Sequence, residues 1–264
     1  MLNLSFLSGD IPKNWKCARV TPVYNGKGDK MTKSNYRPIS VLCHIAKLVE
    51  KEIQTQFLEY LIDHDFICLD QSAYRKYHST QTCLHNTVDE WLQNIDDLLV
   101  TSVCFLDISK CFDTIDHTIL MSKLSNYGVG DYEAKWFQSY LNHREQVVVY
   151  NNEISDSASV TIGVPQGSTL GPLLFLLYVN DLPQYIYNGR IAMFADDTIL
   201  YATGETVHDS EVYLQQCLNS VTDWYDNNRL VLNSNKCQSM LIASSNKVSP
   251  EERDSLSLKL ETTP

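Results

Sequence analysis

Hydrophobic residues recur at helical spacing in several long stretches of the chain. Positions three and four apart fall on one side of each stretch, which is the pattern of an amphipathic helix. The spacing predicts helices over about 44–62, 80–99, 117–127, 131–142, 168–179 and 208–227. In the second of these, which Ser79 or Thr80 would cap, we expect a buried stripe made of Leu84, Val88, Trp91, Leu92, Ile95 and Leu99.

Shorter runs rich in β-branched and aromatic residues predict strands. They lie at about 100–108, 147–150, 159–164, 191–195, 198–202, 230–232, 238–243 and 256–260. The runs 191–195 and 198–202 flank Asp196-Asp197, so we expect a hairpin with this pair at its tip. Gly, Pro, Asn and Lys at short intervals in residues 9–40 indicate loops with short extended pieces. Helices mixed with antiparallel hairpins place the chain in the α+β class.

Composition narrows the class of protein. Of the 264 residues, 44% are hydrophobic and 20% are charged, which is ordinary for a globular protein and excludes a disordered or fibrous chain. Apolar stretches such as 173–179 are far shorter than the about 20 residues that span a bilayer. The N-terminus lacks the basic and apolar segments of a signal peptide. We therefore expect a soluble intracellular protein without a membrane partner, with its eight cysteines reduced.

The formal net charge of −11 disfavours nucleic acid as a partner, but the charge is unevenly distributed. Residues 13–37 contain seven Lys and Arg residues against a single acid, Asp29, whereas residues 100–264 contain 10 basic and 20 acidic residues. A basic segment ahead of an acidic body suits phosphate contact at one end and cation binding at the other. A solvated basic arm explains the first segment equally well.

Three aspartates stand where carboxylates are unusual. Asp107 ends an apolar run that predicts a buried strand, and Asp196-Asp197 separates two apolar runs. Aspartate is common in turns, and this explanation suffices for each position taken alone. Two adjacent like charges repel, however, and a cation would relieve that repulsion. If the strand that ends at Asp107 lies beside the hairpin, the three carboxylates form an oxygen-rich site of the kind that Mg²⁺ prefers.

Six short sequence motifs follow one another along the chain. The central three are Phe-Leu-Asp-Ile-Ser-Lys-Cys-Phe-Asp at 105–113, Pro-Gln-Gly-Ser-Thr-Leu-Gly-Pro at 165–172 and Phe-Ala-Asp-Asp at 194–197. The flanking ones are Asn-Tyr-Arg-Pro-Ile-Ser at 35–40, Gln-Ser-Ala-Tyr-Arg at 71–75 with His-Ser-Thr at 78–80, and Leu-Val-Leu-Asn-Ser-Asn-Lys at 230–236. Together they resemble the reverse transcriptase domain of non-LTR (long interspersed element) retrotransposons, over residues 11 to about 243.

The resemblance implies roles for four residues in catalysis. Asp107 and Asp196 match the carboxylates that bridge two Mg²⁺ ions, which Mn²⁺ can replace, and Asp197 matches the supporting third. Lys236 matches the lysine that protonates the leaving pyrophosphate. An exposed surface cation is the other interpretation of Lys236.

Further residues match positions that contact the nucleotide or template. Phe112 resembles the steric gate that excludes a ribose 2′-hydroxyl, and a packed core aromatic is the alternative. Gln166 and Gly167 resemble the turn beneath the incoming nucleotide, where a helix cap by Ser168 is compatible. Arg75 resembles the arginine that grips the triphosphate, although a surface cation is again possible. Arg37 is assigned to the same basic face, in contact with template or nucleotide.

For the whole chain, the resemblance implies the fingers and palm of a right-hand polymerase, with an antiparallel palm sheet packed on helices and the thumb absent. We expect fingers at about 1–99 and 144–165 and palm at about 100–143 and 166–264. The partners would be an RNA template, a DNA primer and dNTPs, in the nucleus, with thumb and endonuclease supplied by a longer parent polyprotein. One departure is Ala73-Tyr74-Arg75 where the family usually has Gly-Phe-Arg. The alternatives are an inactive retroelement remnant that at most binds nucleic acid, and an RNA-templated RNA polymerase, which Phe112 disfavours.

Overall fold

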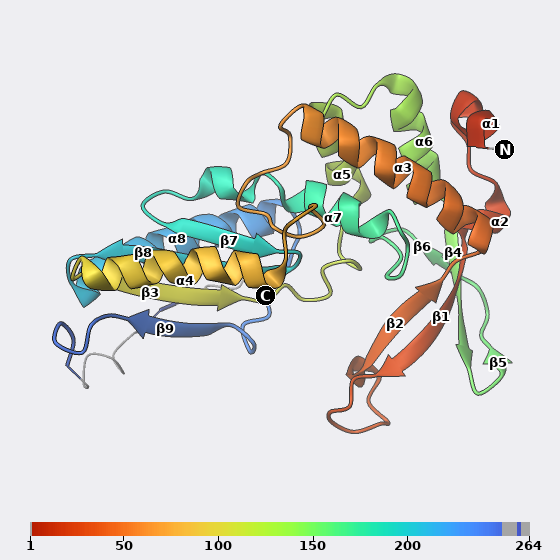
Figure 1. Cartoon of the computed structure of the whole chain (residues 1–264). Helices are drawn as coiled ribbons and strands as arrows, with labels where there is room; N and C mark the ends of the chain where they lie inside the picture. The colour runs from red at the N-terminus through yellow and green to blue at the C-terminus, as the bar shows by residue number, and fades with distance from the viewer. Residues whose placement is uncertain (1, 250–257, 260–264) are drawn as a thin grey trace. The chain divides into compact units, whose positions relative to one another are not determined.

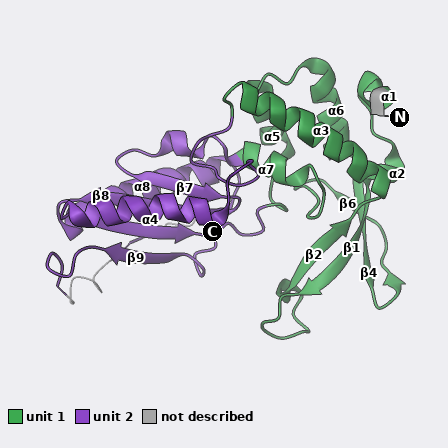
Figure 2. Cartoon of the chain, in the orientation of Figure 1, with its two compact units in different colours: residues 1–66, 112–178 green, residues 67–111, 179–264 purple. Residues whose placement is uncertain are grey.

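The computed structural model describes residues 2–249 and 258–259. The chain divides into two compact units, each built from two separate stretches (Figure 2). Unit 1 contains residues 1–66 and 112–178, and unit 2 contains residues 67–111 and 179–264. The chain therefore passes from one unit to the other three times. None of the helices in the described stretches combines the length and the apolar character that crossing a membrane requires.

Unit 1 is built around a helix that is apolar on every side. This helix, α7 (Gly171–Val179), buries all its side chains from Leu173 to Val179, which places it at the centre of the unit. The other helices of the unit are α1 (Leu2–Ser8), α2 (Lys13–Lys16), α3 (His44–Asp63), α5 (His117–Asn126) and α6 (Asp131–Leu141), with the short 3₁₀ helix η1 (Lys33–Asn35). Trp136, Phe137 and Tyr140 of α6 are buried beside them, and the Trp136 ring stacks on Phe6 of α1.

The sheet of unit 1 extends from these helices as a ribbon of strands (Figure 1). Its strands lie in the order β2 (Tyr36–Val41), β1 (Cys17–Tyr24), β4 (Arg144–Tyr150) and β5 (Glu153–Ile154), and β6 (Ala158–Val160) also pairs with β4. The pairing of β1 with β2 is antiparallel, whereas β1 and β4 run parallel. Two regular strands thus occupy much of the segment 9–40, for which the sequence predicted loops with short extended pieces.

Unit 2 is a four-stranded antiparallel sheet between two helices (Figure 1). The strand order is β7 (Arg190–Phe194), β8 (Asp197–Gly204), β3 (Val100–Leu106) and β9 (Gln238–Ile242). Trp91 of α4 (Thr80–Asp96) packs on Val103 and Tyr201 on one face. On the other face, Ser102 of β3 bonds to Ser210 of α8 (Val207–Asn227) over 2.8 Å. The 3₁₀ helix η2 (Leu182–Tyr185) precedes β7.

Most predicted elements are confirmed to within a few residues, but several predicted bounds and one predicted buried stripe need correction. In α4 the buried residues are Cys83, Thr87 and Trp91, so the predicted stripe was wrong for Leu84, Val88 and Leu92, which remain 40–53% exposed. Helix α7 begins at Gly171 instead of 168, strand β6 is limited to 158–160, and the run 230–232 forms only a bridge from Leu232 to Ile108. The predicted strand 256–260 falls almost entirely outside the described residues.

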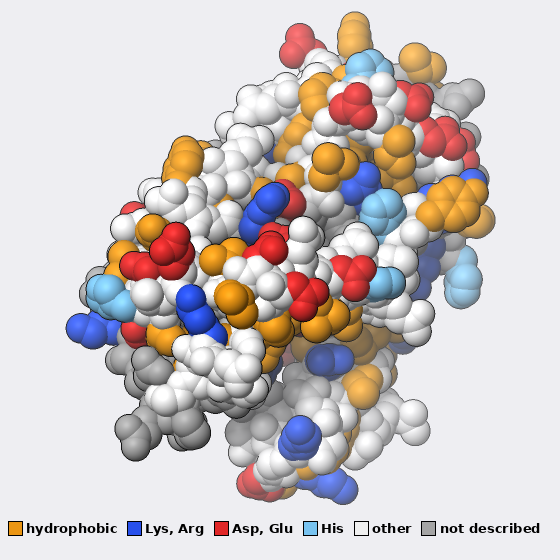
Figure 3. Space-filling view, turned by 60° about the vertical axis from the view of Figure 1, so that its left-hand side comes forward, with side chains coloured by type: hydrophobic (Ala, Val, Ile, Leu, Met, Phe, Trp, Pro, Cys, Tyr) orange, Lys and Arg blue, Asp and Glu red, His pale blue; other side chains and the backbone are white. Residues whose placement is uncertain are grey.

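Charges of both signs are mixed on one face of the molecule. On the face shown in Figure 3, acidic and basic side chains lie close to one another with hydrophobic side chains between them. The net charge of −11 is therefore not concentrated as a single negative field over this face. Local clusters, and not the overall charge, decide what each part of the surface binds.

Candidate active site

Asp107 and Asp197 occupy matching positions on neighbouring strands of unit 2. Strands β3 and β8 pair antiparallel up to Leu106 opposite Thr198, so the next residues on the two strands are Asp107 and Asp197. Side chains alternate between the two faces of a sheet, which puts both aspartates on the face that carries Val103 and Tyr201. Two carboxylates that the chain separates by ninety positions thus meet at one end of the sheet.

Asp196 lies beside them in the turn between β7 and β8. The last pair of this hairpin is Phe194 opposite Asp197, so the turn consists of Ala195 and Asp196. The predicted tip, Asp196-Asp197, was therefore displaced by one residue, because Asp197 already belongs to β8. The thiol of Cys111 donates to the Asp196 carboxylate with an Sγ–Oδ2 distance of 3.5 Å.

The three carboxylates interact electrostatically. Burial raises the pKa of Asp197, and the negative charges of Asp196 and Asp107 raise it further, while Lys236 opposes them. Asp196 also raises the pKa of Tyr74, for which burial is the main cause. Asp107 and Asp196 therefore lie close enough to Asp197 for their negative charges to oppose its ionisation.

Lys236 forms an ion pair with Asp107. Its Nζ lies 3.0 Å from Asp107 Oδ2, with the lysine side chain 66% exposed. Backbone contacts bring the two residues together, because Asn233 donates its N–H to the Asp107 carbonyl and the Lys236 N–H bonds back to Asn233. The segment after α8 thus returns to the end of β3 and delivers a cation to the carboxylate cluster.

The donor set of this cluster suits a hard divalent cation. Carboxylate oxygens are the ligands that Mg²⁺ and Mn²⁺ prefer, and a cation would remove the repulsion that raises the pKa of Asp197. Within residues 2–249 and 258–259, no three His, Cys, Asp or Glu side chains already form a complete set of metal ligands. Asp107 instead faces the Lys236 ammonium group. The residues fit a metal, but their side chains are not arranged around one.

Arg75, also in unit 2, is bound to its own loop. Its Nη1 donates to the carbonyl oxygens of Cys68 and Gln71, both at 3.3 Å. The neighbouring residue Ala73, which replaces the usual glycine, is buried and has no positive φ. The backbone of Ala73 itself is therefore not strained, whereas the next residue, Tyr74, has a left-handed φ of +59°.

The remaining predicted residues belong to unit 1. Phe112 is half-buried and its ring lies 5.3 Å from that of Phe175 in α7. Its carbonyl accepts the Val164 N–H at 2.8 Å, which ties the Phe112 backbone to the segment that precedes Gln166. Phe112 is thus held both by ring packing and by backbone pairing.

Gln166 and Gly167 form a tight turn against β2. The Gln166 carbonyl accepts the Ser40 N–H at 2.7 Å. Gly167 has a φ of +117°, and a Cβ at this position would lie 2.6 Å from the Ser40 carbonyl oxygen. Only glycine fits this conformation and this contact. Arg37, in the same strand as Ser40, is exposed and pairs with Val23 of β1.

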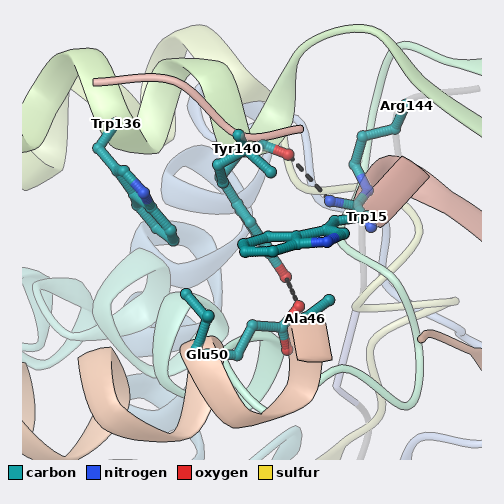
Figure 4. A pocket seen from close by; sticks show the side chains of 8 residues that line it. Trp15, Ala46, Glu50, Trp136, Tyr140 and Arg144 are labelled. Carbon is teal, nitrogen blue, oxygen red and sulfur yellow. Dashed lines mark hydrogen bonds between the residues drawn. The ribbon is translucent and has the colours of Figure 1, made fainter. Parts of the chain in front are cut away.

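Glu50 supports this turn, a role that the sequence did not reveal. This buried residue of α3 accepts the Thr169 and Leu170 N–H groups through Oε2, at 2.7 and 3.3 Å. Its Oε1 accepts a hydrogen bond from the Tyr140 hydroxyl, and the backbone carbonyl of Tyr140 accepts one from Nη1 of Arg144 (Figure 4). One feature of the sequence could have indicated this role: Glu50 is an acidic residue between Val49 and Ile53, two apolar positions of a predicted helix.

Comparison with known protein families identifies the chain. The family model described as "Reverse transcriptase (RNA-dependent DNA polymerase)" matches residues 26–260. The chain belongs to this family. Among its relatives are "Probable RNA-directed DNA polymerase from transposon BS" of Drosophila melanogaster, 30% identical over 81% of this chain and 24% of that protein, and the polymerase of the mobile element jockey of the same species, 26% identical over 89% and 26%.

These relatives are non-LTR retrotransposon polymerases, which confirms the predicted branch of the reverse transcriptase family. The chain spans about a quarter of the length of the curated relatives it matches. Among solved structures, telomerase from Candida tropicalis superimposes with a TM-score of 0.63, at 9% identity, over 91% of this chain and 44% of that one. That likeness confirms the fold class of a reverse transcriptase domain, which is mixed α and β with antiparallel strand pairing prominent.

Proposed function

We propose that this reverse transcriptase domain adds deoxynucleotides to the 3′-hydroxyl of a DNA primer along an RNA template. The observation that supports this activity is the convergence of Asp107, Asp196 and Asp197 at one end of the β3–β8 ladder, where burial and then the charges of the other two aspartates raise the pKa of Asp197. Strained carboxylate clusters of this kind are typical of metal-assisted phosphoryl transfer.

In the reaction, the primer 3′-oxygen forms a bond to the α-phosphorus of the dNTP, and the bond from that phosphorus to pyrophosphate breaks. Asp107, Asp196 and Asp197 would hold Mg²⁺, or Mn²⁺ in its place. When bound, the two ions of this mechanism supply positive charge that activates the hydroxyl and stabilises the leaving group. The carboxylates contribute by fixing these charges where negative charge develops.

Cationic side chains have complementary tasks. Lys236, already directed at Asp107, would donate a proton to the leaving pyrophosphate. Arg75 would exchange its two carbonyl acceptors for triphosphate oxygens, since a guanidinium binds phosphate with two parallel hydrogen bonds. Arg37 would contact template or nucleotide phosphate from the exposed face of β2.

The residues of unit 1 would select the substrate. Phe112 would exclude a ribose 2′-hydroxyl by steric contact, its ring fixed by Phe175. Gln166 and Gly167 would support the incoming nucleotide and the template base. The assignment of fingers to about 1–99 and 144–165, and of palm to about 100–143 and 166–264, stays a prediction, as do a nuclear location and a parent polyprotein that supplies thumb and endonuclease.

Primer extension tests the proposal. The chain is incubated with poly(rA)/oligo(dT), dTTP and Mg²⁺, and then with Mn²⁺, beside an Asp196→Asn variant. We expect extension by the wild-type chain and none by the variant. Because the 32 acidic residues outnumber the 21 basic ones, we expect few phosphate contacts, so binding to primer–template should be weak and only slightly dependent on salt.

A second candidate is a folded remnant that binds nucleic acid without polymerising. The net charge of −11 and the orientation of Asp107 toward Lys236 favour it. Undetectable extension with either metal, both in the 264-residue chain and in a chain lengthened to the extent of its relatives, would establish the remnant. Extension by either chain would establish the enzyme.

A further inference from the structure

Gln71 is a completely buried residue of unit 2 whose side-chain amide, among the described residues, bonds to backbone groups. Its side chain has no exposed area. Oε1 accepts the N–H groups of Ala73 and Ala195, at 2.9 and 3.1 Å, and Nε2 donates to the Ala195 carbonyl at 3.4 Å. One amide group therefore holds both polar groups of the Ala195 backbone, and an amide is suited to this because it can donate and accept at once.

Ala195 needs this support because its backbone is strained. Its φ is +57°, in the left-handed region that residues with a Cβ seldom adopt. Such conformations persist only where surrounding contacts enforce them, and they occur often at functional sites. Ala195 is also the first residue of the β7–β8 turn, directly before Asp196 and Asp197.

The segment that contains Gln71 is itself fixed to β7. The Met193 N–H donates to the Asp70 carbonyl at 2.8 Å, and the Ser72 N–H donates to the Met193 carbonyl at 2.9 Å. Gln71 thus projects from a segment in register with the strand that leads into the turn. A displacement of its side chain would change the direction in which the turn presents the two carboxylates.

We propose that Gln71 is a positioning residue for the metal-binding carboxylates: by holding Ala195 in the left-handed conformation, it aims Asp196 and Asp197 at a shared divalent cation. The inference rests on the proposed function, which assigns that cation to the carboxylates. It adds a residue that contacts neither substrate nor metal. Partners of this outer kind commonly contribute tenfold or more to metal affinity.

The test compares Gln71→Met with Asn94→Leu. Methionine keeps the length and volume of glutamine but loses its hydrogen bonds. Asn94 offers a matched control, because its Nδ2 bonds to Thr101 and Thr203 Oγ1 at 3.2 and 3.1 Å, at the opposite end of the β3–β8 ladder. The first measurement is the Mn²⁺ concentration at half-maximal rise in melting temperature, taken for each variant relative to its own metal-free state.

We expect Gln71→Met to raise that concentration by about tenfold or more and Asn94→Leu to leave it within about twofold. Adding Ala195→Gly should restore much of the loss in the Gln71→Met background, because glycine adopts a positive φ without strain. The same addition should do nothing for Asn94→Leu. If Gln71→Met does not fold, Gln71→Asn, which keeps the amide but withdraws it by one methylene, should show the same order of effects.

Amide hydrogen exchange supplies a readout without metal. The Ala195 N–H should exchange at least about tenfold faster in Gln71→Met, because it loses its buried acceptor, and should be unchanged in Asn94→Leu. Equal Mn²⁺ midpoints in the two variants, or an unchanged Ala195 exchange rate, would overturn the role of Gln71 alone. A wild-type chain whose melting temperature responds to Mn²⁺ no more than that of Asp196→Asn would instead overturn the proposed function, and this inference with it.

Discussion

The ammonium group of Lys236 lies 3.0 Å from a carboxylate oxygen of Asp107, at the place where the structure gathers its three aspartates. This cation partly neutralises the cluster, and we expect it to compete with the proposed divalent ion for Asp107. We expect Lys236→Met to lower the free energy of unfolding by only about 0.5 kcal/mol, since the lysine is largely exposed. The variant should respond to lower Mg²⁺ concentrations than the wild type while its primer extension slows.

The measurement is an Mg²⁺ titration followed by melting temperature, with Lys247→Met as the control because Lys247 is an exposed lysine of the same unit. A Mg²⁺ midpoint that rises in Lys236→Met would mean that the lysine assists metal binding, contrary to the competition expected here.

Removing one carboxylate should separate metal binding from stability. Asp196 raises the pKa of Asp197 through like-charge repulsion, so Asp196→Asn should slightly stabilise the metal-free chain at neutral pH. The same change removes one of the proposed metal ligands, so the rise in melting temperature with Mg²⁺ or Mn²⁺ should disappear. Differential scanning calorimetry with and without metal measures both effects, and an equal metal response in wild type and variant would refute the site.

Gly167 should tolerate no side chain. Gly167→Ala combines a φ of +117° with a Cβ only 2.6 Å from the Ser40 carbonyl oxygen, and we expect it to cost about 1–3 kcal/mol in urea unfolding. Gly26→Ala is the matched control: its φ of +78° is also positive, but nothing lies within 4 Å of the added Cβ. It should cost about 1 kcal/mol. Equal losses of unfolding free energy in Gly167→Ala and Gly26→Ala would show that the contact with Ser40 adds nothing to the cost of the positive φ.

The buried carboxyl of Glu50 should make stability depend on pH. Burial raises the pKa of this carboxyl above its value in the unfolded chain. Four groups lower the pKa but do not offset burial: the Thr169 and Leu170 N–H groups, the Tyr140 hydroxyl and Arg144. A raised pKa in the folded state means that Glu50 stabilises the protein below the pKa of the unfolded chain, near pH 4.5, and that this contribution is lost as pH rises through the folded value.

Glu50→Gln removes this titration, so the wild type should lose stability relative to the variant as pH increases from about 4 to 7. Urea unfolding at several pH values in this range measures the difference. A wild type that gains relative to the variant would show that the hydrogen-bond donors and Arg144 outweigh burial.

Phe112 should control sugar selectivity if the chain polymerises. Phe112→Val shortens the side chain that would exclude a 2′-hydroxyl, and the preference for dTTP over UTP in primer extension should fall by about tenfold or more. Phe175→Leu, which alters the ring that packs on Phe112, should reduce the preference less. Unchanged selectivity in an active Phe112→Val chain would be consistent with a polymerase but would refute the steric-gate role of Phe112.

The convergence of the three aspartates could be predicted because each of the strands that carry them has a clear local sequence pattern. Apolar runs before Asp107 and on both sides of Asp196-Asp197 were sufficient to predict the strands, and the motif order supplied their pairing. The one-residue displacement of the hairpin tip could not be read from residue types. It depends on the left-handed backbone of Ala195, whose N–H and carbonyl both bond to the side chain of Gln71, 124 positions earlier in the chain.

Helix α4 shows a different limit of sequence patterns. Leu84, Val88 and Leu92 have the spacing of a buried stripe, yet the structure buries Cys83, Thr87 and Trp91. Both sets repeat every four residues, so periodicity alone does not distinguish them. The choice is made by Trp91, which packs edge-on against Tyr201 with ring centroids 5.8 Å apart and thereby sets the rotation of the helix.

The alternation of the chain between its two units sets an order in which a ribosome can complete them. Unit 1 has all its residues once position 178 has been made, whereas unit 2 still lacks β7, β8, α8 and β9. During this interval β3 has left the ribosome without either neighbouring strand, and its apolar run has no sheet to join. Synthesis of the hairpin that carries Asp196 and Asp197 is therefore also the event that first gives β3 a partner.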